Sequence, residues 1–270
     1  MDLQLKGKCA LVTGSSSGIG TGIARILAAE GATVVVHGRD IQRTHAVAKD
    51  IIDHGGTAHV ALGDLSTTAG CVAVIEQTLG EVGVVDILVN NAGGKTTEGN
   101  PDWFDVPWAD WTGTYEQNVG AAVRLIQQLA PLMKTRKWGR IIQIASASGI
   151  QPEAGLGEYQ AAKAAMINLS VGLARSLKHT GITVNTVTPG TIHTPAVSQW
   201  LAHVAQQNGW GEDLAEIERR FTSEYIPLCV NRLGEPEDIG RVVALLASPL
   251  SGYISGANYR VDGGQCRSVN

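Results

Sequence analysis

The sequence lacks several features that would mark a specialised class of protein. Its four cysteines include no C-x-x-C pair, so neither a zinc knuckle nor a dithiol redox motif is indicated. Its seven histidines show no H-E-x-x-H or other ligand spacing, and we therefore expect no metal site. No apolar run approaches the roughly 18 residues of a membrane span, and charges stand where a signal peptide would have its apolar core. We expect a cytoplasmic protein with reduced cysteines and no membrane partner.

An excess of charge is also absent. The 21 Lys and Arg residues against 25 Asp and Glu residues give a formal net charge of −4, which does not predict a nucleic-acid partner. An apolar content of 44% and a charged content of 17% exclude a disordered or coiled-coil chain. Glycine, in contrast, is abundant: 33 of 270 residues, about 12% against an average near 7%. This abundance indicates tight turns and places where the backbone approaches a ligand closely.

Short apolar segments rich in Val and Ile alternate with helical patterns along the chain. These segments lack polar–apolar alternation, which is typical of strands that are covered on both faces. The repeated strand–helix–strand order predicts an α/β fold, a doubly wound parallel sheet with helices on both sides. No composition break or linker divides it, so we expect one domain over residues 1–270. The predicted strands are residues 9–12, 33–36, 59–62, 87–89, 140–144, 183–187 and 258–261.

One segment, residues 194–229, interrupts this alternation because it contains no predicted strand. Thr194 and Pro195 are typical of the start of a helix. Two packed surface helices would explain the pattern. A substrate lid would also explain it, and we favour the lid because the segment follows the end of a strand, where open α/β sheets bind ligands. The two predicted helices have apolar faces formed by Val197, Trp200, Leu201 and Val204 and by Leu214, Ile217 and Phe221.

The first predicted strand runs directly into a glycine-rich turn, Thr13-Gly14-Ser15-Ser16-Ser17-Gly18-Ile19-Gly20, and then into a helix. Glycines let the backbone turn sharply, and the free N–H groups at a helix N-terminus hold phosphate. At the first strand of an α/β pattern, this turn predicts dinucleotide binding by a Rossmann-type fold. The spacing is G-x-x-x-G-x-G rather than G-x-G-x-x-G.

That spacing resembles the short-chain dehydrogenase/reductase family, near its 3-oxoacyl-acyl-carrier-protein reductase-like carbonyl reductases. Asn90-Asn91-Ala92-Gly93 matches the family's N-N-A-G, and Ser146 precedes Tyr159 by 13 residues, with Lys163 four residues further on. Pro189-Gly190-Thr191-Ile192-His193-Thr194 matches P-G-x-I-x-T, and the resemblance extends from about Leu5 to Gly264. It implies an enzyme with the catalytic residues Asn118, Ser146, Tyr159 and Lys163. The residues expected to bind the cofactor are Gly14, Ser16, Ser17, Gly18, Ile19, Arg39, Asp64, Leu65, Asn91, Ala92, Gly93, Tyr159, Lys163, Pro189, Gly190, Ile192 and Thr194.

Tyr159 and Lys163 lie four residues apart and therefore share one face of a helix. A phenol has a pKa near 10, and a nearby ammonium and an oxidised nicotinamide would lower that pKa. Tyr159 is then the expected general acid/base for interconverting a ketone and a secondary alcohol by hydride transfer. The Ser146 hydroxyl could bond the same substrate oxygen, and its spacing to Tyr159 favours it over the turn serine Ser148. Asn118 could simply bond the helix backbone, whereas the resemblance implies that it holds a water linking Lys163 to solvent.

The end of the second strand bears on the choice between NAD and NADP. NAD enzymes of this design hold the ribose hydroxyls with a carboxylate here, but this chain has Gly38 followed by Arg39. Glycine leaves room for a 2′-phosphate and a guanidinium can grip it, so NADP(H) is favoured over NAD(H). Asp40 lies one position too late, yet its nearness keeps NAD open, as does Ser17 where many NADP-dependent members carry a base.

The substrate and the assembly are less constrained. Pro131 and Thr180 stand where carrier-protein reductases present docking cations, which favours a free small-molecule ketone or alcohol as the substrate. The alternatives are an NAD-dependent alcohol dehydrogenase working in the oxidising direction, a 3-oxoacyl-thioester reductase, and, remotely, a non-catalytic cofactor-binding regulator. The resemblance implies a homotetramer or homodimer with helices around residues 118–133 and 159–177 at the interface. Three tryptophans, Trp103, Trp108 and Trp111, could line a substrate cleft or pack in the core or at a subunit interface.

Overall fold

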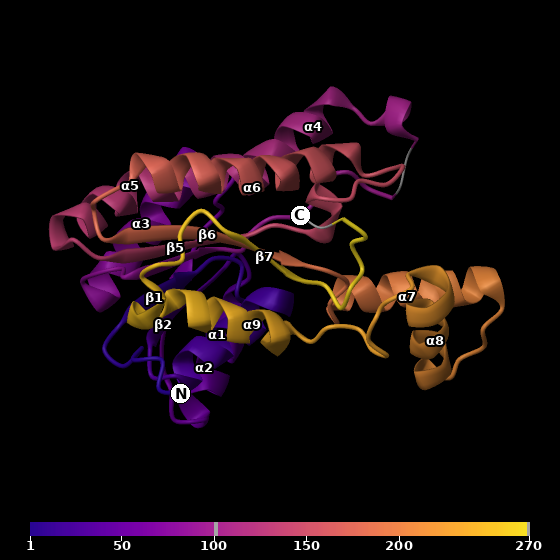
Figure 1. The fold of residues 1–270 in the computed structure, drawn as a ribbon, viewed down its shortest axis with the longest axis horizontal. Coiled ribbons are helices and arrows are strands. Elements are labelled where there is room, and N and C mark those ends of the chain that lie inside the picture. Colours follow the sequence, from indigo (N-terminus) through magenta and orange to yellow (C-terminus); the bar gives the residue numbers. More distant parts are fainter. Residues whose placement is uncertain (100–101, 269–270) are drawn as a thin grey trace.

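The computed structural model describes residues 1–99 and 102–268. Within these ranges, seven strands form one parallel sheet in the order β3-β2-β1-β4-β5-β6-β7 (Figure 1). All seven predicted strands are confirmed. Several are longer than predicted; β2, for example, continues to Gly38 because His37 and Gly38 pair with Ala61 and Leu62 of β3. The strands are β1 Cys9–Val12, β2 Thr33–Gly38, β3 Thr57–Leu62, β4 Ile87–Asn90, β5 Gly139–Ile144, β6 Ile182–Pro189 and β7 Asn258–Val261.

Helices cover both faces of the sheet, as Figure 1 shows. Helices α1, α2 and α9 pack on one face, and α3, α5 and α6 pack on the other. No helix in the described residues is long and apolar enough to cross a membrane. The helices are α1 Gly18–Ala29, α2 Ile41–Asp53, α3 Thr68–Val82, α4 Trp108–Tyr115, α5 Ala121–Arg136, α6 Gly157–Ser176, α7 Pro195–Asn208, α8 Leu214–Arg220 and α9 Pro236–Ala247.

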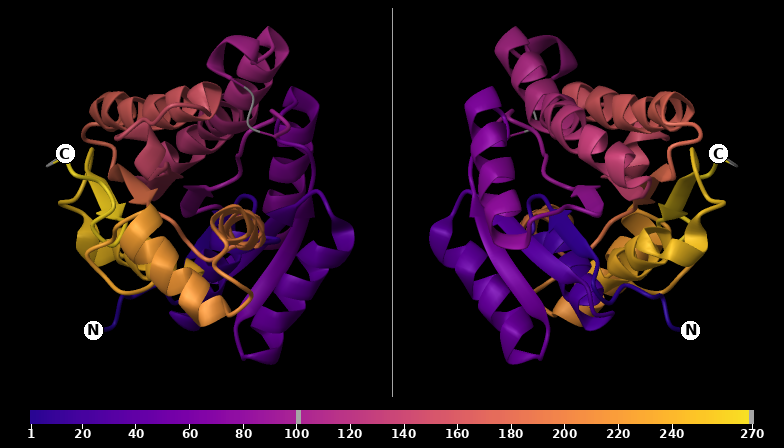
Figure 2. Two further views of the ribbon diagram at one scale, coloured as in Figure 1. Left: turned by 90° about the vertical axis from the view of Figure 1, so that its right-hand side faces the viewer. Right: turned by 90° about the vertical axis from the view of Figure 1, so that its left-hand side faces the viewer.

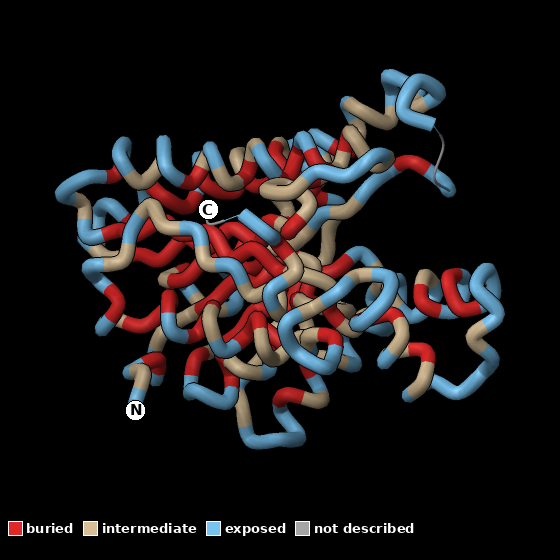
Figure 3. Tube along the Cα trace, turned by 45° about the vertical axis from the view of Figure 1, so that its right-hand side comes forward, coloured by how far each residue is buried: buried red, intermediate tan, exposed pale blue. Residues whose placement is uncertain are grey.

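Successive residues of the inner strands enter two different apolar cores. Ala10 and Val12 of β1 pack under α1 and α9, while Leu11 packs under α3 and α5. Val34 and Val36 of β2 share the first of these cores. Both faces are therefore apolar, which explains why the strands show no polar–apolar alternation. Figure 3 shows the resulting buried centre of the molecule.

Residues 194–229, which we call the lid segment, project from the end of the molecule that faces the viewer in the left view of Figure 2. As predicted, it holds two helices. Helix α7 begins where expected, because Thr194 Oγ1 accepts a hydrogen bond from the backbone N–H of Val197. Helix α8 is followed by a π-helical turn, Phe221–Tyr225. The segment has an apolar core of its own, separate from the two beside the sheet, made by Leu201, Val204, Ala205, Ile217 and Phe221 together with Leu233.

Candidate active site

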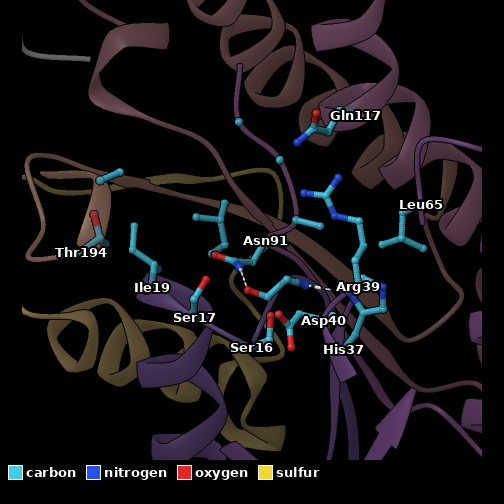
Figure 4. Close-up of a pocket in the computed structure, with 18 of the residues that line it drawn as sticks. Ser16, Ser17, Ile19, His37, Arg39, Asp40, Leu65, Asn91, Gln117 and Thr194 are labelled. Carbon is cyan, nitrogen blue, oxygen red and sulfur yellow. Dashed lines mark hydrogen bonds between the residues drawn. The ribbon is translucent and has the colours of Figure 1, made fainter. Parts of the chain in front are cut away.

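A cleft of about 480 Å³ crosses the carboxyl ends of the central strands and reaches the start of α7. The glycine-rich loop, the ends of β2 and β3, the N-N-A-G segment and the start of α6 all contribute to it (Figure 4). All of the residues expected to bind the cofactor line this cleft except Pro189, Gly190 and Ile192. The two ends of the predicted site, the glycine loop and the Tyr159–Lys163 pair, thus belong to one continuous surface.

The three exceptions lie behind the cleft rather than on its surface. Pro189 is buried as the last residue of β6. The backbone N–H of Gly190 donates to Val261 O, and a Cβ there would lie 2.7 Å from Asp262 Cα. Ile192 is buried and forms a bridge with Gly234. These residues shape the turn after β6 that brings Thr194 to the cleft, and their contact with the cofactor stays a prediction.

The glycine-rich loop is held tightly against β4. Gly14 adopts a left-handed φ of 64°, and a Cβ there would lie 2.9 Å from Ala92 Cα, so the position requires glycine. Asn91 Nδ2 donates to the carbonyl oxygens of Thr13 and Gly14 at 2.9 and 3.2 Å. Ser17 precedes α1 without capping it through its side chain. The N–H groups at the start of α1 are therefore available to hold phosphate.

At the end of β2 the arrangement differs from the sequence prediction. Gly38 does not leave empty space, because a Cβ there would collide with Thr44 Oγ1 and lie 2.6 Å from Ser16 Oγ. Asp40 caps α2 by accepting from the backbone N–H of Arg43 at 2.9 Å, and its carboxylate pairs with Arg43 Nε at 3.1 Å. These hydrogen bonds, that to the Arg43 backbone first, lower the pKa of Asp40.

Arg39 is exposed and lines the cleft, and Figure 4 shows its side chain among the residues around it. In the part of the chain that the structure describes, its guanidinium has no hydrogen-bond or salt-bridge partner. Asp40 is therefore already engaged with a cation, whereas Arg39 is available to bind an anion.

Tyr159 and Lys163 line the other end of the cleft, and Ser146 lies beside Tyr159. Lys163 Nζ lies 5.6 Å from the centre of the Tyr159 ring and donates to Ile144 O at 3.0 Å. The Ser146 hydroxyl lies near enough to Tyr159 to lower the pKa of its phenol. Ser146 Oγ also accepts from the backbone N–H of Ser148 at 3.2 Å. Of the two candidate serines, Ser146 is thus the one that contacts the tyrosine.

The pKa values of this pair depart from their usual range because Lys163 is buried and Tyr159 is half-buried in the cleft. Burial raises the pKa of the Tyr159 phenol, and the hydrogen bond with Ser146 opposes this rise. Burial lowers the pKa of the Lys163 ammonium to about 8. We expected the ammonium to lower the pKa of Tyr159. In the protein alone burial has the larger effect and Lys163 Nζ is directed at a backbone carbonyl, so the lower pKa beside an oxidised nicotinamide stays a prediction.

Asn118 lies in a π-helical turn, Glu116–Gly120, between α4 and α5. Its Nδ2 donates to Gly94 O at 2.6 Å and to Thr114 O at 2.7 Å, and its Oδ1 accepts from the backbone N–H of Gly94 at 3.2 Å. It therefore bonds both the helix backbone and the loop after β4. A Cβ at Gly93 would collide with Asn118 Oδ1 and lie 3.4 Å from Lys163 Nζ. The two predicted catalytic side chains thus lie close to the same glycine.

The tryptophans lie near the start of α6 rather than in the sheet core. Trp103 and Trp111 pack edge to face with centroids 5.6 Å apart. A Cβ at Gly157, two residues before Tyr159, would collide with Trp103 and lie 3.2 Å from Trp111. Trp108 is 76% exposed, so core packing is excluded for it.

Sequence reasoning missed several residues that line the cleft. Three of them, His37, Arg43 and Gln117, have side chains with hydrogen-bonding nitrogen atoms. A signal for His37 was present, since it comes directly before Gly38 at a strand end. Arg43 and Gln117 follow from the placement of helices, which no motif marks. Among the described residues, no group of three or more His, Cys, Asp or Glu side chains could hold a metal ion.

Comparisons with known proteins agree over the whole chain. It is 37% identical over 269 residues to the uncharacterized oxidoreductase YvrD of Bacillus subtilis (strain 168), with 100% of both chains covered. It is 34% identical over 269 residues to the 7alpha-hydroxysteroid dehydrogenase of Escherichia coli (strain K12), covering 100% of this chain and 98% of that one.

Solved structures match as well. L-sorbose reductase from Gluconobacter frateurii, complexed with NADPH and L-sorbose, has a TM-score of 0.92 and 34% identity, with 100% of both chains covered. A 7 alpha-hydroxysteroid dehydrogenase complexed with NADH has a TM-score of 0.84 and 32% identity, with 100% of this chain and 98% of that one covered. The model of the short chain dehydrogenase family matches residues 8–205. The chain therefore belongs to the short-chain dehydrogenase family and is an oxidoreductase.

Proposed function

We propose that this protein is an NADP(H)-dependent oxidoreductase that interconverts a small-molecule ketone and a secondary alcohol. One observation carries the proposal: a single cleft joins Arg39 and the start of α1, which has no side-chain cap, to Tyr159 and Lys163, beside which Ser146 lies. An extended dinucleotide fits such a surface, with its phosphates at α1 and its nicotinamide near Tyr159.

The reactive end of the cleft suggests how the protein's own groups act. A bound nicotinamide supplies or accepts the hydride. The Ser146 hydroxyl and the Tyr159 phenol would both hydrogen-bond the substrate oxygen. Tyr159 would give its proton to this oxygen during reduction and take it back during oxidation. Lys163, charged below a pKa of about 8, would favour the phenolate that remains. Asn118 would keep the loop after β4 in place beside Lys163.

The preference for NADP(H) is supported by the charges at the end of β2. The Arg39 guanidinium has no partner within the described residues and could bond a 2′-phosphate bidentately. The sorbose reductase structure, which holds NADPH, is consistent with this preference. NAD(H) is the second candidate, because Asp40 also lines the cleft and the hydroxysteroid dehydrogenase structure holds NADH.

For the substrate, we favour a free ketone or alcohol with a hydroxylated or ring-shaped body. The ligands in the structures of the two solved relatives, L-sorbose and 7-oxo glycochenodeoxycholic acid, span that range. The lid segment and the Trp103–Trp111 pair would bound the substrate on two sides. We also propose a cytoplasmic homotetramer or homodimer. The apolar Leu132 of α5 and Val171 of α6 are exposed, as an interface through these helices would require.

A turnover screen of ketones and alcohols with NADPH and NADH tests the proposal. We expect reduction of at least one ketone with NADPH at higher kcat/KM than with NADH. The Tyr159→Phe variant is the matched control, because it keeps the ring and loses the proton donor. Activity that is equal in this variant would remove Tyr159 from the mechanism, and a preference for NADH would assign the cofactor to the second candidate.

A further inference from the structure

His37 is the penultimate residue of β2 and lines the cleft, and Figure 4 shows the hydrogen bond at its ring. The residue is 3% exposed. Its Nδ1 accepts a hydrogen bond from the backbone N–H of Gly14 at 2.9 Å, and its Nε2 lies 3.2 Å from Gly63 O. Its backbone N–H donates to Ser15 Oγ, and its carbonyl accepts from the backbone N–H of Ser15, both at 2.9 Å. His37 therefore connects the segments that follow β1 and β3 to the end of β2.

These partners define the protonation state of the imidazole. The Gly14 N–H can only donate and the Gly63 carbonyl can only accept, so Nδ1 must carry the lone pair and Nε2 the proton. A protonated ring would direct an N–H group at the N–H of Gly14. Burial lowers the pKa of His37 to about 4; the Gly63 carbonyl and Asp64 oppose this shift, and Arg39 adds to it. At neutral pH the ring is in the form that the two bonds need.

The bond to Gly14 holds one side of the glycine-rich loop. On the other side, Asn91 Nδ2 holds the carbonyl oxygen of the same residue at 3.2 Å. Ser16, Ser17 and Gly18 follow directly and line the cleft. Without an acceptor from the His37 ring, the Gly14 N–H would lose its partner, and on this side only the backbone bonds between His37 and Ser15 would still hold the loop. The loop would then be less ordered in the free protein, and ordering it when the cofactor binds would lower the affinity for the cofactor.

We propose that His37 is a positioning residue for the cofactor, and that cofactor affinity depends on the hydrogen bond from the Gly14 N–H to Nδ1. This inference rests on the proposed function, since it concerns the dinucleotide that the cleft would hold. His37 itself takes no part in hydride or proton transfer. Its removal is expected to change the dissociation constant of the cofactor and to leave kcat at saturating cofactor nearly the same.

Two substitutions test the roles of the two ring nitrogens of His37 separately. In His37→Asn the amide oxygen lies at the place of Nδ1, so the acceptor for Gly14 is kept and the contact with Gly63 is lost. In His37→Gln the amide reaches the place of Nε2, so the contact with Gly63 is kept and the acceptor for Gly14 is lost. His59→Asn is the matched control, because His59 lies on the neighbouring β3 and bonds Glu81 at 2.8 Å outside the cleft.

Fluorescence titration with NADPH and with NADH gives the dissociation constants of the four proteins. We expect wild type, His37→Asn and His59→Asn to agree within about twofold, and His37→Gln to bind at least about fivefold more weakly, which corresponds to about 1 kcal/mol for an unpaired donor. Equal weakening in the Asn and Gln variants, or no weakening in either, would overturn the inference while wild-type binding upholds the proposed function. Absence of dinucleotide binding by wild type would overturn both.

A pH titration of the folded proteins keeps the test independent of folding defects. As the pH falls from 7 to 4, about half of the His37 rings become protonated, and NADH binding should weaken about twofold more in wild type than in His37→Asn. The charged groups that face the imidazole, Arg39 and Asp64, are common to both proteins, so the difference between them reports His37 alone. Parallel curves for the two proteins would overturn the inference.

Discussion

Replacing Phe221 by Ala should loosen the lid segment and leave the sheet intact. Phe221 is fully buried in the core of this segment. Its ring packs edge to face on Trp200 at 4.9 Å and stacks on Tyr225 at 5.2 Å. Removing a buried Phe costs about 3 to 5 kcal/mol, including the cavity that remains. The residues that lose this energy belong to a core that is separate from the two cores of the sheet.

Amide hydrogen exchange shows which residues lose protection in the Phe221→Ala variant. A loss of about 3 to 5 kcal/mol speeds local opening by about two to three and a half orders of magnitude. Amides in residues 196–225 should therefore exchange at least about a hundredfold faster in the variant, whereas those of β1, β4 and β5 should keep their protection. Substrate KM should rise, and the dissociation constant of the cofactor should stay within about twofold.

Leu27→Ala in α1 is the contrasting variant, because Leu27 is fully buried in the core under the sheet. It should lower protection across the whole molecule. If Phe221→Ala lowered protection in the sheet strands to the same extent as in the lid segment, the segment would not be a separate packing unit. The reasoning from its separate core would then be refuted.

Three further outcomes are expected. Tyr159→Phe should lose about two to four orders of magnitude in kcat while keeping cofactor affinity, as measured by steady-state kinetics and titration; turnover near that of wild type would contradict its role. Arg39→Ala should weaken NADPH binding by about 1.5 to 3 kcal/mol and barely change NADH binding, with the α6 residue Arg175→Ala as control; equal weakening of both cofactors would make Arg39 a surface residue. Stability should fall as the pH drops from 6.5 toward 4. Because the pKa of His37 is about 4 in the folded protein, the unfolded chain takes up its proton first, at a cost of roughly 3 kcal/mol by pH 4. Denaturant unfolding at several pH values should show that the free energy of unfolding of wild type falls with pH and that this fall is absent in His37→Asn. Equal pH dependence in the two proteins would exclude His37 as the cause.

All seven strands of the sheet could be predicted because their signal is local. Val34 and Val36 point to one face of the sheet and Val35 points to the other. A strand with apolar side chains on both faces is buried only between two layers of helices. The ends of the strands were less certain. His37 extends β2 because it pairs with Ala61, a contact that hydrophobicity does not mark.

The site could be predicted where short motifs mark it, and not where packing decides. The spacing from Ser146 to Tyr159 identified the side chains that meet, but it did not indicate that Lys163 would donate to Ile144. Gly38 was interpreted as free space, although Thr44 from the following helix fills that space. The residues next to Gly38 in the sequence do not show that a side chain from a later helix will fill the space beside it.

The π-helical turn at Asn118 has a consequence for the long helical rod formed by α4 and α5. One residue more per turn shifts the angular phase of everything before it by about 100° relative to everything after it. Helix α4 can therefore turn its face to α6 while α5 turns its apolar face to the sheet. Deleting one residue from this turn would restore a straight α-helix and rotate the two faces out of step. Either α4 would leave α6 or Asn118 would leave Gly94, so the surplus residue sets the phase between Asn118 and the face of α4 that packs on α6.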